Sequence, residues 1–247
     1  MEIRERLSDL RRSLRVHPRQ RLMFALDVAS LEEARPLVAQ LASEVGVFKV
    51  GLELFTAAGP AALTAVHDSG RQSFLDLKLH DIPATVERAV ASAVRLGATY
   101  LTVHAAAGPA ALRAAASVAR DSQLHLLAVT LLTSTDEAQL AAIGMQGPLP
   151  SALSRLARMA VDCGIPGLIC APSDCATLRS ELGADVLLVT PGVRPTGADA
   201  GDQKRIGTPS AAITAGADCL VVGRPIRDAS DPSAAARGIV QDIARAL

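Results

Sequence analysis

Short apolar runs alternate with longer helical patterns from one end of the chain to the other. The eight runs, rich in Val, Leu and Ile, cover residues 22–28, 45–52, 73–78, 100–104, 124–130, 167–170, 186–190 and 219–222. Continuous apolar runs separated by helices are typical of parallel strands that are buried on both faces. Eight such units in 247 residues predict an α/β fold of the (β/α)₈ type, a TIM barrel, whose usual length is about 250 residues.

A doubly wound open sheet is the competing arrangement of such units. That fold holds its ligand with a Gly-x-Gly-x-x-Gly turn after the first strand. The first apolar run here leads instead into Asp-Val-Ala-Ser (27–30). Since no linker of different composition divides the chain, we expect one barrel domain over residues 21–247, and we expect it to carry the active site.

The first 20 residues lie outside this pattern. Residues 1–21 hold seven arginines and three acidic residues without an apolar core, unlike a secretory signal. Apolar side chains recur there at helical spacing, at Ile3, Leu7, Leu10 and Leu14. We expect residues 1–20 to form an extra N-terminal helix packed on the barrel. An arginine-rich transit peptide is the alternative, and the acidic residues argue against it.

Charge and cysteine content exclude several classes of function. The 25 basic and 25 acidic residues give zero formal net charge, so no overall field attracts nucleic acid or an anionic membrane. No uninterrupted apolar stretch reaches the roughly 18 residues that a membrane span needs. The four cysteines form no Cys-x-x-Cys pair. We therefore expect neither a structural zinc site nor a disulfide framework, and we expect buried free thiols in a reducing compartment, the cytoplasm.

One expected strand carries charged side chains where a buried strand is normally apolar. Because the side chains of a strand alternate between its two faces, Asp76 and Lys78 share one face and the neighbouring leucines share the other. Asp81 follows three residues after the lysine. Burying a carboxylate and an ammonium costs several kcal/mol each, of order, unless the two are paired. We expect this face to open on a polar site, for which chemistry is the leading explanation.

Polar side chains also stand at the ends of most other runs. They are Asp27, Lys49, His104, Thr133, Arg194 and Arg224. In a TIM barrel the carboxyl ends of the strands meet at one mouth, where active sites lie. A single polar residue at a strand end often caps a helix, but polar residues at the ends of these six runs, together with the charged run 73–78, favour one shared site.

The last two strands lead into a pattern suited to phosphate. Thr-Pro-Gly-Val-Arg-Pro (190–195) follows one strand, and Val-Val-Gly-Arg-Pro-Ile (221–226) follows the other at a helix start. Loops at these positions commonly bind phosphate in TIM barrels, where glycine admits the ligand and arginine supplies a fork of donors. The long segments 131–150 and 191–208 are also of the length that functional loops have. The alternative is that Gly223 only forms a turn and Arg224 a surface ion pair.

Eight segments together resemble the orotidine 5′-phosphate decarboxylase family over roughly residues 22 to 230. They are Ala-Leu-Asp (25–27), Phe-Lys-Val-Gly (48–51), Asp-Leu-Lys-Leu-His-Asp-Ile-Pro (76–83), Val-His-Ala (103–105), Val-Thr-Leu-Leu-Thr-Ser (129–134), Thr-Pro-Gly-Val-Arg (190–194), Asp-Gln (202–203) and Val-Val-Gly-Arg (221–224). The Asp-x-Lys-x-x-Asp core alone is shared with sister sugar-phosphate barrels. One departure is Ala107, where a second glycine is expected.

The resemblance implies a carbon–carbon lyase that converts orotidine 5′-monophosphate to uridine 5′-monophosphate and CO₂ in de novo pyrimidine biosynthesis, with no cofactor and no metal. It implies that Lys78 protonates C6 and that Asp76 faces the departing carboxylate. Lys49 and Asp81 would complete an alternating Lys-Asp-Lys-Asp array. The resemblance also implies a homodimer, in which Asp81 and Thr85 would act in the partner subunit's site.

The resemblance also implies how the nucleotide substrate binds. Asp27 and Lys49 match the contacts to the ribose hydroxyls, and Thr133 matches the region over the base. The phosphate clamp would be made by Arg194, Gln203, Gly223 and Arg224. His80 and His104 match the family pattern without an acid or base role.

The chemistry agrees with these roles. Loss of CO₂ from C6 leaves a vinylic carbanion that the ring does not stabilise as an enolate. No motif indicates pyridoxal phosphate, thiamine or a metal cage, so electrostatic stabilisation remains, with the Lys78 ammonium fixed beside the carbon that becomes negative.

Two other functions stay open at this point. One is a Mg²⁺-dependent decarboxylase or aldolase of the same barrel superfamily acting on a sugar phosphate, for which Glu53 or Glu87 would have to supply metal ligands. Lys49 and the Ile-Pro pair at 82–83 favour the pyrimidine enzyme instead. The other is a non-catalytic barrel that binds a phosphate ligand, which would leave the Asp and Lys array unexplained.

Overall fold

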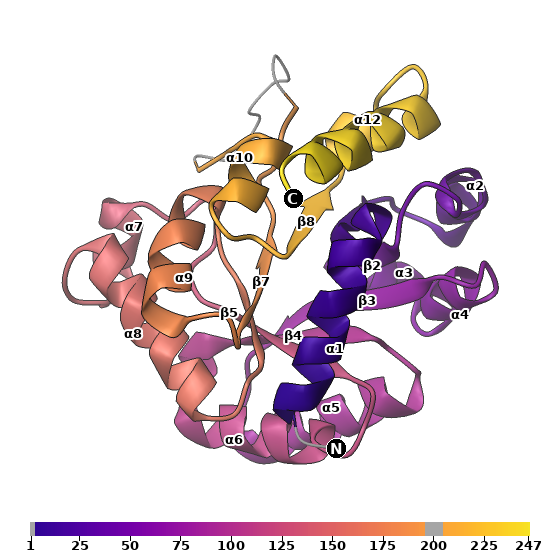
Figure 1. Ribbon diagram of the computed structural model, residues 1–247. Coiled ribbons are helices and arrows are strands. Elements are labelled where there is room, and N and C mark those ends of the chain that lie inside the picture. The colour runs from indigo at the N-terminus through magenta and orange to yellow at the C-terminus, as the bar shows by residue number, and fades with distance from the viewer. Residues whose placement is uncertain (1–2, 196–204) are drawn as a thin grey trace.

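The computed structural model describes residues 3–195 and 205–247, and of residues 3–7 and 15 only the backbone. Eight parallel strands close into a barrel in the order β1 to β8, with helices packed around the outside (Figure 1). The strands are β1 Leu22–Leu26, β2 Val47–Gly51, β3 Gln72–Leu79, β4 Tyr100–His104, β5 His125–Val129, β6 Gly167–Ile169, β7 Leu187–Thr190 and β8 Cys219–Val222. The predicted TIM barrel is confirmed, and every strand lies within two residues of its apolar run.

The helices occupy the segments between the strands, and one precedes them. They are α1 Ile3–Val16, α2 Leu31–Leu41, α3 Leu52–Ala58, α4 Ala61–His67, α5 Pro83–Arg95, α6 Gly108–Ala119, α7 Glu137–Ala142, α8 Leu149–Asp162, α9 Cys175–Leu182, α10 Pro209–Thr214, α11 Arg224–Arg227 and α12 Pro232–Arg245. Short 3₁₀ turns are η1 Pro18–Arg21, η2 Ala105–Ala107 and η3 Pro172–Asp174. The long segment after β5 therefore contains a helix of its own, α7.

Side chains inside the barrel change from apolar to polar along the strands. Phe74 belongs to the buried apolar cluster of the interior, and Asp76, two residues further along β3, lines a cavity. Val47 and Lys49 on β2 repeat this order. Because alternate residues of a strand face the same side, each strand contributes to a packed core at its amino end and to a polar site at its carboxyl end.

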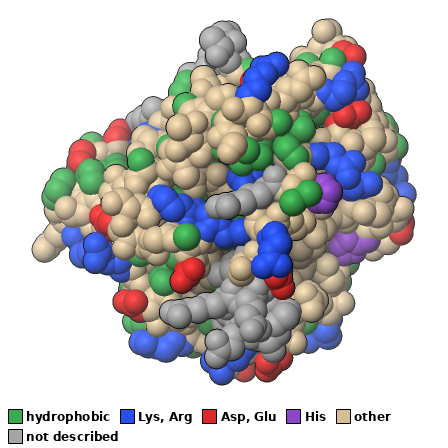
Figure 2. Space-filling view, viewed as in Figure 1, with side chains coloured by type: hydrophobic (Ala, Val, Ile, Leu, Met, Phe, Trp, Pro, Cys, Tyr) green, Lys and Arg blue, Asp and Glu red, His purple; other side chains and the backbone are tan. Residues whose placement is uncertain are grey.

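Helix α1 closes the amino end of the barrel. It crosses in front of the strands in Figure 1, and Leu14, only 1% exposed, packs in the cluster of the barrel interior, with Leu10 against it. Figure 2 shows this face, where Lys and Arg side chains gather near the centre. The predicted extra helix is thus an integral part of the fold.

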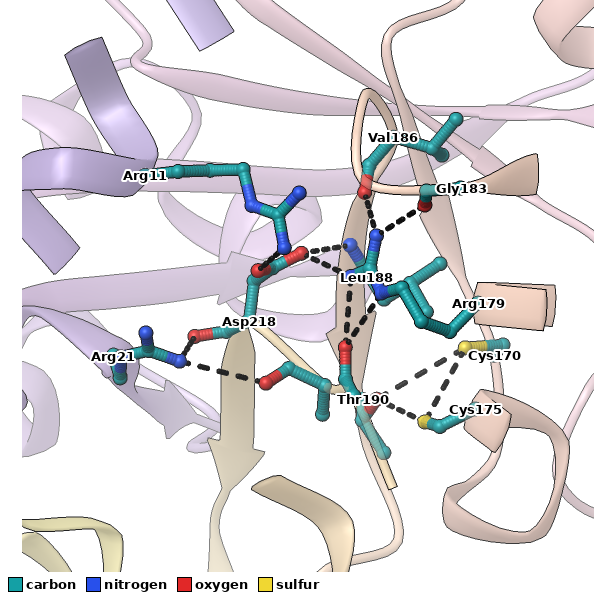
Figure 3. Close-up of polar contacts among 12 residues, drawn as sticks. Arg11, Arg21, Cys170, Cys175, Arg179, Gly183, Val186, Leu188, Thr190 and Asp218 are labelled. Carbon is teal, nitrogen blue, oxygen red and sulfur yellow. Dashed lines mark hydrogen bonds and ion pairs between the residues drawn. The ribbon is translucent and has the colours of Figure 1, made fainter. Parts of the chain in front are cut away.

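Asp218, just before β8, fastens α1 to the barrel. Its carboxylate pairs with Arg11 of α1 at 2.8 Å and with Arg179 of α9 at 2.7 Å (Figure 3). It also accepts a hydrogen bond from the backbone N–H of Leu188 at 2.9 Å. The guanidinium of Arg21 donates to the backbone carbonyl of Asp218 at 3.1 Å. A buried carboxylate with this many donors satisfies the condition for burying charge.

All four cysteines are buried free thiols, as predicted. Burial raises the pKa of Cys219 well above its usual range, because the thiolate would lose its hydration. Cys170 and Cys175 lie 3.8 Å apart at their sulfur atoms, and Cys175 is 3.2 Å from the hydroxyl of Thr190 (Figure 3). Among the described residues, no helix has the length and apolar character needed to cross a membrane.

We predict that Leu14→Ala destabilises the protein by about 2–5 kcal/mol, because truncation leaves a cavity in the barrel interior. Urea unfolding at fixed pH measures this loss. Val16→Ala on the same helix is the matched control: Val16 is 66% exposed, so its truncation is expected to change the free energy of unfolding by less than about 0.5 kcal/mol. Equal effects of the two substitutions would show that α1 does not close the barrel core.

Candidate active site

A cavity of about 270 Å³ opens at the carboxyl end of the barrel. Predicted site residues that line it are Asp27, Lys49, Asp76, Lys78, Thr133, Arg194, Gly223 and Arg224. They come from segments that are far apart in sequence and that only a closed barrel brings together. Apolar side chains complete the wall, among them Val129, Ile169 and Val221.

Four charged side chains form a continuous chain in this cavity. The Lys49 ammonium lies 2.8 Å from Asp27 Oδ1 and 3.7 Å from Asp76 Oδ2. The Lys78 ammonium lies 2.8 Å from the same Asp76 oxygen. The order is therefore Asp27, Lys49, Asp76, Lys78. Within one chain Asp27, rather than Asp81, supplies the second carboxylate of the alternating array.

Asp76 is the centre of this arrangement. Burial by itself would raise the pKa of its carboxyl, but the ammoniums of Lys49 and Lys78 and hydrogen bonds from Lys78 and Thr102 outweigh burial and lower it. The side chain is 12% exposed, and the Thr102 hydroxyl donates to Oδ1 at 2.9 Å. Asp76 is consequently held as a carboxylate with both oxygens engaged.

Strand β3 is irregular where it carries Asp76 and Lys78. Its pairing with β4 passes from Leu75↔Leu101 directly to Leu79↔Val103. Lys78 has a φ of 50°, and it is the one non-glycine residue with positive φ in the described part of the chain. The left-handed conformation costs about 1–2 kcal/mol for a residue with a side chain. Asp76 and Lys78 do face the same cavity, as expected, but through a bulge and not through regular alternation.

The loops after β7 and β8 bring arginines to the cavity. Arg194 is only 6% exposed, and its backbone N–H donates to the Gly207 carbonyl at 2.9 Å. Arg224 is the first residue of α11, directly after Gly223. A Cβ at Gly223 would lie 3.3 Å from the Ala25 Cβ, so this position is crowded by the neighbouring strand. These features suit an anion held between two loops.

Arg227 ties the loop after β1 to this region. Its guanidinium donates to the backbone carbonyl of Asp27 at 2.6 Å and pairs with Asp228 at 2.6 Å. The Asp228 hydrogen bond raises the pKa of Arg227. The backbone of Asp27, whose carboxylate begins the charged chain, is therefore fastened to α11 by Arg227.

Two predicted site residues, Asp81 and Thr85, are not among the residues that line the cavity of this chain. Asp81 is exposed and accepts a hydrogen bond from the Ile82 backbone at 2.7 Å, and Thr85 lies in the first turn of α5. Gln203 lies outside the described residues. Ile82, next to Asp81, is 66% exposed, so residues 80–84 present an apolar and charged surface beside the cavity.

The two histidines of this region stack on each other. The rings of His80 and His104 are 5.3 Å apart, and His104 Nδ1 accepts a hydrogen bond from the Ala106 backbone at 3.2 Å. Burial, helped by His80 and Lys78, lowers the pKa of His104, so a neutral ring caps the turn η2. Ala107 in that turn has a φ of −65°, which suits alanine as well as glycine.

Sequence reasoning missed two polar residues near the cavity. Thr102 touches Asp76 and Lys78, and its signal is a polar residue at the centre of the apolar run 100–104. Arg205 pairs with Asp174 at 2.6 Å and donates to the Leu132 carbonyl at 2.9 Å, which joins the loops after β5, β6 and β7. No sequence signal distinguishes it from a surface arginine.

Ligands for a metal ion are not gathered here. In residues 3–195 and 205–247 no group of three or more His, Cys, Asp or Glu side chains is placed to hold one. Glu53 and Glu87 are exposed and neither is among the lining residues. Within the described residues, neither glutamate is therefore in place to serve the metal-dependent alternative.

Comparisons with known proteins give one consistent result. The model of the Orotidine 5'-phosphate decarboxylase / HUMPS family matches residues 20–239. A protein named Orotidine 5'-phosphate decarboxylase from Anaeromyxobacter sp. (strain K) is 53% identical over 222 residues, covering 90% of this chain and 97% of that protein. One of the same name from Thermobifida fusca (strain YX) is 50% identical, covering 90% and 95%. The crystal structure of Orotidine 5'-phosphate decarboxylase from Lactobacillus acidophilus is similar with a TM-score of 0.80 and 35% identity, covering 91% of this chain and 99% of that one.

We predict that Asp76→Asn lowers the free energy of unfolding at pH 7 by about 1–3 kcal/mol, since two ammoniums lose their shared charged partner. The pKa of Asp76 is lowered in the folded protein. Its contribution is therefore complete above the unfolded pKa of about 3.9 and is lost as the pH falls through the folded value. The difference between the proteins should shrink as the pH falls below about 3.9 in urea unfolding experiments.

The matched control is Asp121→Asn, at an exposed position after α6. It should alter stability by less than about 0.5 kcal/mol. An Asp76→Asn protein as stable as the parent at pH 7, or a difference that is constant with pH, would contradict the described electrostatics.

Proposed function

The chain belongs to the orotidine 5′-phosphate decarboxylase / HUMPS family, and we propose that its charged chain of Asp27, Lys49, Asp76 and Lys78 is the catalytic centre. The enzyme is a lyase that decarboxylates orotidine 5′-monophosphate to uridine 5′-monophosphate in pyrimidine biosynthesis. The observation that carries the assignment of the centre is the 2.8 Å contact between Lys78 and Asp76 in a cavity that Arg194 and Arg224 also line.

Lys78 is the proton donor in this proposal. The bond between C6 and the carboxylate carbon breaks, CO₂ departs, and the electron pair stays on C6. The Lys78 ammonium then transfers a proton to C6, and solvent returns a proton to the lysine. A fixed ammonium beside the carbon that gains negative charge stabilises the transition state more than the ground state.

The remaining members of the chain position this ammonium. Asp76 holds Lys78 and would face the substrate carboxylate, whose departure relieves the repulsion between the two anions. Lys49 pairs with Asp76 on its other side and, together with Asp27, would contact the ribose hydroxyls. Because two carboxylates alternate with two ammoniums, no member of the chain is left without an opposite charge.

Phosphate and base are assigned to the loops. Arg194, Gly223 and Arg224, with Gln203, would bind the phosphate, and Thr133 would lie over the base. The support for this is that Arg194 is buried beside the cavity and that Arg224 begins a helix directly after Gly223. Binding energy gained at the phosphate, far from C6, can serve to close the loops over the reacting ring.

We also propose a homodimer in the cytoplasm. The exposed segment at 80–84, with Ile82 66% exposed beside the cavity, suits a second copy of this chain. Asp81 and Thr85 would then enter the partner's site, where Asp81 extends the array beyond Lys78. The four buried free thiols are in keeping with a reducing compartment.

Lys78→Ala should lower kcat for orotidine 5′-monophosphate by many orders of magnitude and leave nucleotide binding nearly unchanged, because the phosphate contacts remain. The loss of orotidylate absorbance measures turnover, and calorimetric titration with uridine 5′-monophosphate measures binding. The parent enzyme should keep its activity in excess EDTA. Near-normal turnover by the variant would disprove the role of Lys78, and activity lost in EDTA would favour the metal-dependent alternative.

Two inactive variants test the shared site. If Asp81 acts across a dimer, mixing Asp81→Ala with Lys78→Ala chains creates hybrid dimers in which one of the two sites has both residues. We expect activity to return after subunit exchange to at most about a quarter of the parent level, the statistical share of intact sites. No recovery in a mixture that mass spectrometry shows to contain hybrid dimers would contradict the exchange of Asp81.

A further inference from the structure

Thr102 lies in the middle of β4 and is completely buried. Its hydroxyl touches two groups of the neighbouring strand β3. It donates to Asp76 Oδ1 at 2.9 Å and accepts from the backbone N–H of Lys78 at 2.8 Å. A threonine hydroxyl has one proton to donate and lone pairs to accept, so these two contacts use it in both directions.

The position of Thr102 matches the break in the sheet. Between the pairs Leu75↔Leu101 and Leu79↔Val103, residues 76–78 of β3 stand opposite Thr102 alone. A ladder cannot pair three residues with one, so the Lys78 N–H needs another acceptor. The Thr102 side chain supplies it at the point where the backbone turns left-handed.

Lys78 needs this support because its conformation is unfavourable by itself. Its φ of 50° is found in no other non-glycine residue of the described segments. Strained residues persist only where the surrounding structure holds them. The Lys78 ammonium is held by Asp76 at 2.8 Å, and the Lys78 backbone N–H is held by Thr102 at 2.8 Å. The Thr102 hydroxyl therefore contacts both the backbone of Lys78 and the carboxylate that binds its ammonium.

We propose that Thr102 is a positioning residue for the decarboxylation, which sets the rotation of the Asp76 carboxylate and the backbone of Lys78 so that the ammonium points at the reacting carbon. This inference rests on the proposed function of Lys78 and Asp76. Thr102 itself is not among the residues that line the cavity. It therefore acts through its two neighbours and not on the substrate.

We expect removal of the Thr102 hydroxyl to slow the chemical step and to leave substrate binding nearly unchanged. A displacement of a reacting group by about 1 Å can lower a rate about 10²-fold. Valine has the shape of threonine without the hydroxyl, so Thr102→Val frees the Lys78 N–H and one Asp76 oxygen without opening a cavity. The arginines at the phosphate end are untouched, and KM should change little.

The experiment compares kcat and KM for orotidine 5′-monophosphate in three variants. Thr102→Val should lower kcat about 10²-fold with KM within about 3-fold of the parent. Thr102→Ser, which keeps the hydroxyl, should restore kcat to within about 3-fold of the parent. Thr130→Val is the matched control, because Thr130 is equally buried and its hydroxyl donates to the Ile169 carbonyl at 2.9 Å. Its kcat should stay at the parent value.

Thermal unfolding of each variant establishes that it folds, and Thr102→Ala replaces Thr102→Val if valine does not. A normal kcat in the variant without the hydroxyl, a Ser variant as slow as Val, or an equal loss of kcat in Thr130→Val would overturn the role of Thr102. These results are distinct from failure of the proposed function, which would appear as turnover by Lys78→Ala. An inactive Lys78→Ala beside a fully active Thr102→Val refutes the positioning role alone.

Discussion

The carboxylate of Asp76 is contacted by side chains from three neighbouring strands of the barrel, β2, β3 and β4. It pairs with Lys49 from β2, with Lys78 from its own strand β3, and it accepts from Thr102 of β4. Desolvation acts against its charge, and the two ammoniums and the hydroxyl together overcome it. Each of these contacts requires the neighbouring strands to keep their register, because a shift by one residue would turn a lysine or threonine out of the barrel. The geometry of the site is therefore a property of the closed sheet.

The rigidity that this requires comes from the other end of the barrel. Below the charged side chains the interior is filled by a tightly packed apolar cluster, and Leu14 of α1 completes it. Close-packed protein interiors do not deform continuously. The strands that carry Lys49 and Asp76 are therefore held in a fixed position relative to each other. The ion pairs of Asp218 with Arg11 and Arg179 attach the closing helix to two parts of the barrel wall. Stability and chemistry are thus separated along the strands, and each strand contributes to both.

The sequence predicts the framework closely because buried parallel strands appear as apolar runs, and the carboxyl ends of such strands must meet. The meeting of Asp27, Lys49, Asp76 and Lys78 in one cavity follows from this rule. The sequence does not predict the bulge in β3, since regular alternation would also place Asp76 and Lys78 on one face. The contact of Thr102 depends on that bulge, and the polar residue at the centre of the run 100–104 does not by itself indicate which groups it contacts. The pairing of Lys49 with Asp27 depends on the distance between side chains that come from two neighbouring strands. The spacing of residues along the chain does not give that distance.

The division of charge in the cavity explains how such a site can be both stable and reactive. The opposite charges of Asp27, Lys49, Asp76 and Lys78 alternate in the cavity, which Arg194 and Arg224 also line. In the proposed function these arginines would bind the phosphate of the nucleotide, and its reacting ring would lie against the alternating array. The substrate carboxylate would then meet Asp76, whose own carboxylate lies 2.8 Å from the Lys78 ammonium. As CO₂ leaves, the repulsion between the substrate carboxylate and Asp76 would disappear, and negative charge would move to the carbon beside the Lys78 ammonium. In this proposal the fixed array favours the transition state without any change in its own geometry.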